Sequence, residues 1–185
     1  MRHFSALLLV CIFLVPSAWS GELAGVSLPD EVTVGGATLV LNGMGLRKKF
    51  VVKVYAAGLY LPSKTSDAGV AVQSEGAKKI VMHFLTNKAT KKKMDAAWFE
   101  GFEANSPSVF GAIEGRVKAF AGLFGDMKDG DVIEMTIIPG GGTSVLLNGK
   151  NQGVIEGDDF GAALLKVWLG DHPPTEDLKT GMLGD

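Results

Sequence analysis

Residues 45–62, with the sequence GLRKKFVVKVYAAGLYLP, carry the side chains of this 185-residue chain that are best suited to binding chemistry. They include one arginine, three lysines and both tyrosines. The guanidinium group of Arg47 is a fixed fork of donors that stays charged, so it requires an anionic or carbonyl partner if it is buried. A carboxylate meets that requirement, either from the protein or from a bound ligand.

These two partners of Arg47 predict different sites. A surface salt bridge would contribute only about 0–1 kcal/mol to stability. A desolvated, bidentate contact with a ligand would instead dominate the affinity for that ligand. Composition alone favours the surface salt bridge, with the ligand site as the alternative.

Side chains alternate along residues 50–57, which indicates a strand with two different faces. The wholly apolar face consists of Phe50, Val52, Val54 and Ala56. The mixed face consists of Val51, Lys53, Tyr55 and Ala57. We expect one face to pack in the core and the other to meet water or a cavity. A bulge or tight twist is expected at Ala57-Gly58, which leaves open the side on which Tyr60 lies relative to Tyr55.

Histidine and cysteine offer little for catalysis or metal binding. His83 lies in a predicted strand, where a structural role is favoured over that of a catalytic base. His172, followed by two prolines, is expected to be exposed. The two histidines are far apart and no cysteine follows residue 20, so we predict neither a metal site nor a cofactor.

The first twenty residues have the pattern of a signal peptide. Arg2 precedes the apolar run FSALLLVCIFLV, which is short for a membrane span, and Ala18 and Ser20 are small residues of the kind found at a cleavage site. We predict an exported chain, periplasmic or secreted, that begins at Gly21 and is not inserted in a membrane after processing. An uncleaved anchor is the alternative. Cys11 is the only cysteine, so a core without disulfides must hold the exported domain together.

Charge and composition argue against a nucleic-acid partner. Removing Arg2 with the leader leaves seventeen basic and twenty acidic residues and changes the formal charge from −2 to −3. The basic run TKKKM, at residues 90–94, is interpreted as a solvated helix start, and an anionic surface is the alternative. No linker or repeat divides residues 21–185, which predicts a single domain.

Hydrophobic periodicity predicts strands, then helices, then strands, and then a last helix. Two strands joined at Gly35-Gly36 are expected within 32–43, one strand within 78–85, and three within 131–155, the last two joined at Asn148-Gly149. These connections are antiparallel. Together with helices on one side of the sheet, they predict an α+β layered domain.

Apolar residues that recur every three or four positions predict three helices. Their buried stripes are Met94, Trp98, Phe102; Ile113, Val117, Phe120, Phe124; and Phe160, Ala163, Leu164, Val167, Trp168. Ser106 and Pro107 are expected to separate the first two helices. Asp158 and Asp159 are candidate N-caps of the third.

Three segments of the chain resemble the chalcone isomerase-like family. LNGMGLRKKFVVKVYAAGLYLP is similar to the family's glycine-bounded arginine followed by a VY..GLYL strand. KKIVMHFLTNKATKKKMDAAW resembles its following strand and helix, and GVIEGDDFGAALLKVWLGDHP its last hairpin and helix. The resemblance covers nearly all of residues 21–185. It implies the chalcone isomerase fold, in which a curved antiparallel sheet packs against a layer of helices with a ligand cleft between them.

The same resemblance bears on activity, because the family contains isomerases that cyclise chalcones and relatives that bind fatty acids. Arg47 matches the arginine that stabilises the reacting oxyanion, and Tyr55 falls at the position of a strand hydroxyl. The isomerases' helix tyrosine and asparagine are missing. Lysines around Lys92 lie near the position of the tyrosine, and Phe99 lies near that of the asparagine. Val167 replaces a small polar residue of the last helix.

The sequence therefore predicts an exported, non-catalytic protein that binds a fatty acid or similar small amphipathic carboxylate. Its candidate ligand-binding residues are Arg47, Tyr55, Tyr60 and Lys53. One alternative is an isomerase or lyase acting on an unsaturated carbonyl compound, with Arg47 at the developing enolate and Tyr55 moving protons. Another is a protein-interaction module with a collapsed cleft.

Overall fold

The computed structural model describes residues 19–185, and residues 1–18 of the predicted signal peptide lie outside the described residues. The described chain opens with a hairpin of β1 (Trp19–Leu23) and β2 (Val26–Pro29). Cleavage before Gly21 would shorten β1 by two residues. No helix within residues 19–185 is long and apolar enough to cross a membrane.

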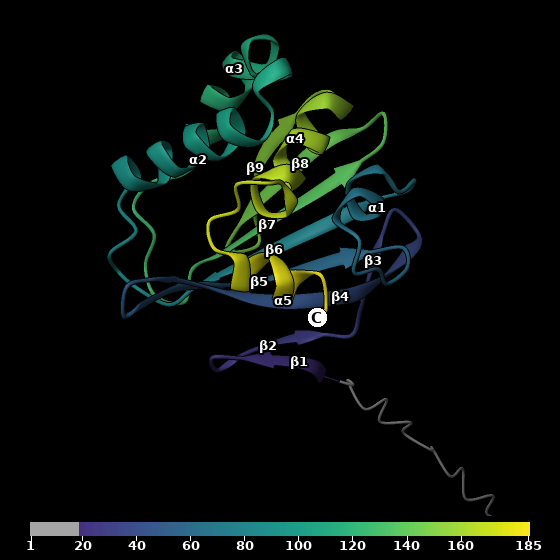
Figure 1. Ribbon diagram of the computed structural model, residues 1–185, viewed down its shortest axis with the longest axis vertical. Coiled ribbons are helices and arrows are strands. Elements are labelled where there is room, and N and C mark those ends of the chain that lie inside the picture. Colours follow the sequence, from purple (N-terminus) through teal and green to yellow (C-terminus); the bar gives the residue numbers. More distant parts are fainter. Residues whose placement is uncertain (1–18) are drawn as a thin grey trace, which may run out of the picture.

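A seven-stranded antiparallel sheet forms the centre of the domain, and each strand pairs with the next one in the chain (Figure 1). Its strands are β3 (Glu31–Val34), β4 (Ala37–Lys49), β5 (Val52–Leu61), β6 (Lys78–Phe84), β7 (Val132–Ile138), β8 (Gly142–Leu147) and β9 (Lys150–Ile155). The predicted turns are confirmed. Gly35, Gly36, Asn148 and Gly149 have the positive φ angles that two-residue hairpin turns require.

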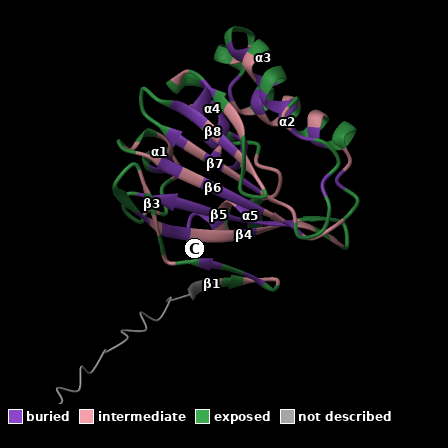
Figure 2. Ribbon diagram, turned by 180° about the vertical axis from the view of Figure 1, so that it is seen from behind, coloured by how far each residue is buried: buried purple, intermediate pink, exposed green. Residues whose placement is uncertain are grey.

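Helices cover one face of the sheet, and the β1–β2 hairpin lies against the other (Figures 1 and 2). The helices are α1 (Ala68–Gln73), α2 (Lys91–Asn105), α3 (Pro107–Ala121), α4 (Asp158–Leu169) and α5 (Glu176–Met182). The main hydrophobic core lies between the sheet and these helices, and a smaller one lies beneath the hairpin. The predicted α+β architecture, a curved antiparallel sheet with a layer of helices, is confirmed.

The helical stripes are buried as predicted, with two differences at helix ends. Phe124 is buried but follows α3, which ends at Ala121. Gly157, rather than either aspartate, is the N-cap of α4. Asp158 accepts a hydrogen bond from the Gly140 amide, and Asp159 binds the guanidinium of Arg116 on α3. Asp159 also accepts from the Phe160 amide in the first turn of α4 over 2.9 Å. Neither aspartate occupies the N-cap position itself, so the predicted N-cap was wrong.

Strands β4 and β5 are bulged against each other at two places, neither of which is the predicted one, and β9 is bulged against β8. Register shifts leave Asn42 as an extra residue in β4 and Val54 as an extra residue in β5. Pairing of β5 with β6 is continuous from Tyr55 to Tyr60, so the bulge expected at Ala57-Gly58 is absent there. Gly58 instead allows close packing, since a Cβ atom at this position would lie 2.3 Å from Cδ1 of Leu28.

Helix α5 packs directly on the backbone of β4. A Cβ atom at Gly45 would lie 2.2 Å from the carbonyl oxygen of Leu178, and one at Gly43 would lie 2.3 Å from that of Gly181. The side chain of Asn42 strengthens this contact by donating to the carbonyl oxygen of Met182 over 2.9 Å. Strand β4, which carries Arg47, is thereby tied to the C-terminal helix.

We expect Gly45→Ala to destabilise the fold by about 1–3 kcal/mol, because the added methyl group overlaps the α5 backbone. The matched control is Gly115→Ala on α3, where an added Cβ meets no atom within 4 Å. That control should stabilise the protein by about 0.5–1 kcal/mol through helix propensity. Urea unfolding of both variants measures the difference, and equal stabilities would contradict the close packing of α5 on β4.

Candidate ligand-binding site

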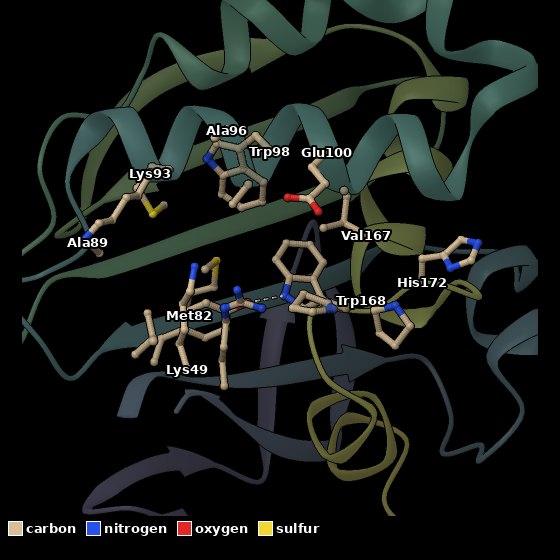
Figure 3. A pocket seen from close by; sticks show the side chains of 18 of the residues that line it. Lys49, Met82, Ala89, Lys93, Ala96, Trp98, Glu100, Val167, Trp168 and His172 are labelled. Carbon is tan, nitrogen blue, oxygen red and sulfur yellow. Dashed lines mark hydrogen bonds between the residues drawn. The ribbon is translucent and has the colours of Figure 1, made fainter. Parts of the chain in front are cut away.

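A cavity of about 810 Å³ lies between the sheet and α2, beside the end of α4 (Figure 3). It is bounded by the β4–β5 turn at one side and by residues 171–174 after α4 at another. Its apolar lining includes Val52, Val54, Met82, Met94, Trp98, Val167 and Trp168. Both Arg47 and Tyr55 also line it, so the structure brings these two predicted residues together.

The bulge in β5 determines which of its side chains reach the cavity. Arg47 pairs with Tyr55 and Lys48 pairs with Lys53, which leaves Val54 as the extra residue. Because a bulge interrupts the two-residue alternation, Val52 and Val54 line the cavity together with Tyr55. Lys53 is exposed and does not line it. The predicted ligand-binding role of Lys53 assumed an uninterrupted alternation and is not retained.

Tyr60 also lies away from the cavity. It is on the opposite face of β5 from Tyr55, in the core beneath the β1–β2 hairpin. Its hydroxyl donates to the carbonyl oxygen of Pro29 over 2.9 Å. Burial, followed by the charges of Asp30 and Glu134, raises the pKa of Tyr60 to about 12. Tyr60 therefore anchors the hairpin, and the structure does not support it as a ligand-binding residue.

Arg47 is half-buried at the cavity and has no acidic partner in the described part of the chain. Ion pairs within 4.0 Å among residues 19–185 are Lys79 with Glu134, Lys91 with Asp95, and Arg116 with Asp159. The surface salt bridge that composition favoured is therefore not formed within these residues. A positively charged fork of donors is left facing a largely apolar space.

Tyr55 is buried at the floor of the cavity, where its hydroxyl meets Trp168. The indole Nε1 of Trp168 donates to the Tyr55 hydroxyl over 3.1 Å. An indole N–H can only donate, so the phenol oxygen must be the acceptor and its own hydrogen is left to donate elsewhere. No acceptor for that hydrogen is present among residues 19–185. Accepting one hydrogen bond also polarises the phenol and makes it a stronger donor.

The Tyr55 phenol stays neutral across the physiological pH range. Burial is the largest influence and raises its pKa, while the nearby charge of Arg47 and the hydrogen bond from Trp168 act in the opposite direction. A neutral phenol next to a guanidinium presents two kinds of donor to the same region. This arrangement suits an anionic oxygen better than a cation.

The segment after α4 closes the cavity at the end away from the β4–β5 turn. The Asn105 side chain at the end of α2 accepts from the His172 amide over 2.8 Å and donates to the His172 carbonyl over 3.0 Å. The imidazole of His172 is exposed, as predicted, at the cavity edge (Figure 3). Pro173 and Pro174 line the cavity beside it.

The remaining sequence-derived positions divide between the cavity and other surroundings. Val167 lines the cavity. Phe99 instead packs edge-on against Phe110 of α3, with ring centroids 6.4 Å apart. Lys92 is exposed outside the lining, and His83 lies in β6 opposite Ala56 and also outside the lining. Within residues 19–185 no group of three or more metal-binding side chains is present.

Sequence analysis missed several lining residues. Trp98 and Trp168 were expected only as core residues because they fall on helical stripes. They serve both purposes, and Trp168 supplies a hydrogen bond that periodicity does not reveal. Lys49, Lys88 and Lys93 line the cavity near its β4–β5 side. Their common location depends on which loops meet at one end of the sheet.

Comparison with known proteins identifies the family. A family model described as chalcone isomerase-like matches residues 20–184. The chain belongs to the chalcone isomerase-like family. The fold of this chalcone isomerase-like protein is also found in a fatty-acid binding protein of Arabidopsis thaliana. That crystal structure has a TM-score of 0.66 and 17% sequence identity, and the alignment covers 86% of this chain and 92% of that one. No curated protein sequence matches the chain significantly.

We expect both tyrosines to resist ionisation in the folded protein, because the pKa values of Tyr55 and Tyr60 are both raised above 10.0. These are the only tyrosines in the chain. Above pH 10 the unfolded chain loses phenolic protons that the folded chain keeps, so this contribution to stability falls as the pH rises. Ultraviolet titration of folded and denatured protein measures the difference. Half of the phenols ionising near pH 10 in the folded state would show that one tyrosine is solvated.

Proposed function

We propose that this chalcone isomerase-like protein binds a fatty acid or a similar small amphipathic carboxylate in the cavity, without isomerase activity. The observation that carries the proposal is the guanidinium of Arg47, which faces a largely apolar cavity with no carboxylate partner among residues 19–185. A ligand carboxylate would supply that partner. Tyr55 would donate its free phenolic hydrogen to the same head group.

The shape and lining of the cavity support an apolar tail. Its volume of about 810 Å³ falls within the range of about 300–1,000 Å³ common for small-molecule sites. Valine, methionine and tryptophan side chains supply much of its apolar lining. The Arabidopsis protein of similar fold is a fatty-acid binding protein, which supports the same class of ligand here.

Charges around the cavity favour one orientation of the ligand. Lys49 and Lys93 lie on one side of the cavity, and Glu100 lies on the side of His172 (Figure 3). Asp171 and Glu176 add negative charge to that second side. A carboxylate is attracted to the basic side and repelled from the acidic one. We therefore propose that the head group lies at Arg47 and the tail along the apolar part of the lining.

The groups that surround the cavity support the proposed absence of isomerase activity. Phe99, which matches the position of the isomerases' asparagine, packs against α3. Val167, which matches their small polar residue in the last helix, adds only apolar surface to the cavity. General acid–base positioning contributes about 10²- to 10⁴-fold in rate. Without such groups, cyclisation of a chalcone should stay near its uncatalysed rate. The alternative is an isomerase that uses Arg47 for the enolate and Tyr55 for proton transfer.

We expect Arg47→Ala to weaken binding of a fatty acid by about 2–5 kcal/mol, with little effect on the corresponding alcohol. Arg47→Lys should restore only part of the affinity, because an ammonium group lacks the planar fork. Tyr55→Phe should cost about 0.5–1.5 kcal/mol of binding, and less once Arg47 is removed. Isothermal titration calorimetry with the acid and the alcohol measures each effect.

The matched control is Lys53→Ala, which removes an exposed charge from the same strand outside the lining and should leave affinity unchanged. Equal affinities across all variants would contradict the carboxylate site. Saturable turnover of a chalcone that is lost in Arg47→Ala would establish the isomerase instead. Mass spectrometry of small molecules released on denaturation separates both outcomes from a cavity that holds no ligand.

We also propose that the protein is exported, either to a periplasm or out of the cell, after removal of residues 1–20. The support is the apolar run after Arg2 and the small residues before Gly21. Intact-mass analysis of the protein from its native source should give a chain that begins near Gly21. A full-length species retained in the membrane fraction would overturn the proposal.

A further inference from the structure

The turn between β4 and β5 projects two apolar side chains into solvent. Phe50 is 92% exposed and Val51 is 97% exposed. Phe50 also adopts a φ angle of 55°, a conformation that non-glycine residues rarely take. Glycine or asparagine would fit this backbone with less strain. We call residues 48–53 the hairpin tip.

Basic residues surround these two apolar side chains. Arg47, Lys48 and Lys49 precede Phe50, and Lys53 follows Val51, with no acidic residue between positions 47 and 53. Lys48, Lys49 and Lys53 are exposed, and none of them forms an ion pair within residues 19–185. The tip is therefore strongly basic on a chain whose formal net charge is −2.

A second basic segment lies beside the tip. Lys88 and Lys93 line the same cavity as Lys49 and Phe50. Two acidic side chains near this segment have partners, since Asp95 pairs with Lys91 and Asp126 accepts from the Lys91 amide. One edge of the cavity thus combines exposed apolar groups with lysines from the β4–β5 hairpin and from the start of α2 and the segment that leads into it.

We propose that the hairpin tip docks this edge of the cavity onto the surface of an anionic lipid bilayer. Phe50 and Val51 would enter the interfacial layer, and the surrounding lysines would bind the anionic head groups. Apolar side chains combined with basic ones are the combination that holds peripheral proteins at such surfaces. The contact is reversible docking and involves no membrane-spanning segment.

The form of the tip favours a bilayer over a protein partner. A specific protein interface usually needs about 800 Å² from each partner and a core from which charged residues are depleted. The tip is a narrow turn with two apolar residues flanked by lysines. A fluid lipid surface can surround such a projection without a complementary groove.

Docking at this edge extends the proposed function. Phe50 and Lys49 belong both to the tip and to the cavity lining, so a docked protein would hold the basic side of the cavity at the lipid surface. An amphipathic carboxylate could then exchange between bilayer and cavity without crossing bulk water. The docking itself does not depend on which ligand the cavity takes.

The test is flotation of the protein with vesicles of phosphatidylcholine containing phosphatidylglycerol, and with vesicles of phosphatidylcholine alone. The wild type should bind the anionic vesicles more strongly, and added salt should weaken that binding. Phe50→Asn combined with Val51→Ser should reduce binding at least tenfold through lost apolar burial. Lys48→Gln and Lys53→Gln should each reduce it about fivefold.

Matched controls lie at the opposite end of β5. Val70→Ser removes an apolar side chain that is 53% exposed, and Lys64→Gln removes an exposed charge. Both should bind vesicles as the wild type does. All proteins carry the same N-terminus, so any contribution of residues 1–18 is common to every comparison. Failure of the wild type to bind anionic vesicles, or equal losses in tip and control variants, would overturn the proposal.

Docking and ligand binding can fail independently. Val51 and Lys48 lie outside the cavity lining, so Val51→Ser and Lys48→Gln should weaken vesicle binding while keeping fatty-acid affinity in solution. Vesicle binding without any measurable ligand affinity would support docking and contradict the proposed ligand. The reverse result would contradict docking alone.

Discussion

The hydrogen bond from Trp168 Nε1 to the Tyr55 hydroxyl joins the last long helix to the central sheet at the floor of the cavity. Both side chains are buried, so loss of either partner would leave the other polar group without this hydrogen bond. An unsatisfied buried donor costs about 1–3 kcal/mol, more than the net contribution of an ordinary hydrogen bond. The bond therefore specifies how α4 sits on β5 as well as adding stability.

Aromatic packing extends this constraint to α2. The ring of Trp98 meets that of Trp168 edge-on, with centroids 5.7 Å apart, and meets Phe120 of α3 in the same way at 5.0 Å. Such edge-to-face contacts add about 0.5–1.5 kcal/mol each beyond the area they bury. Three helices and the sheet are thus linked through one aromatic cluster. Trp98 and Trp168 also line the cavity, so a ligand would meet two side chains that are already held by this packing.

Strand β4 holds Arg47 in place from its other end. The bulge at Asn42 directs an amide side chain to the backbone of Thr65 and Met182, and the glycines nearby let α5 lie directly on the strand. Beyond Arg47 the residues of β4 are exposed, and the strand ends in the exposed turn at Phe50 and Val51. The β4–β5 hairpin therefore has one end that is fixed by α5 and positions the guanidinium of Arg47, and an exposed tip that can contact another surface.

The sequence by itself determined the elements and much of their order, because alternation and helical spacing are local patterns. It identified the turns at Gly35-Gly36 and Asn148-Gly149, the buried stripes of α2 and α4, and the motif around Arg47 that marks the family. Only the tertiary structure decided which side chains share the cavity. The bulge at Val54 excludes Lys53, continuous pairing past Gly58 sends Tyr60 to the other face, and the missing acidic partner of Arg47 becomes visible only when the described residues are placed together. The physical reason is that a bulge depends on hydrogen bonds between two strands, and the bond from Trp168 to Tyr55 joins residues 113 positions apart. Neither leaves a periodic signal within a single segment.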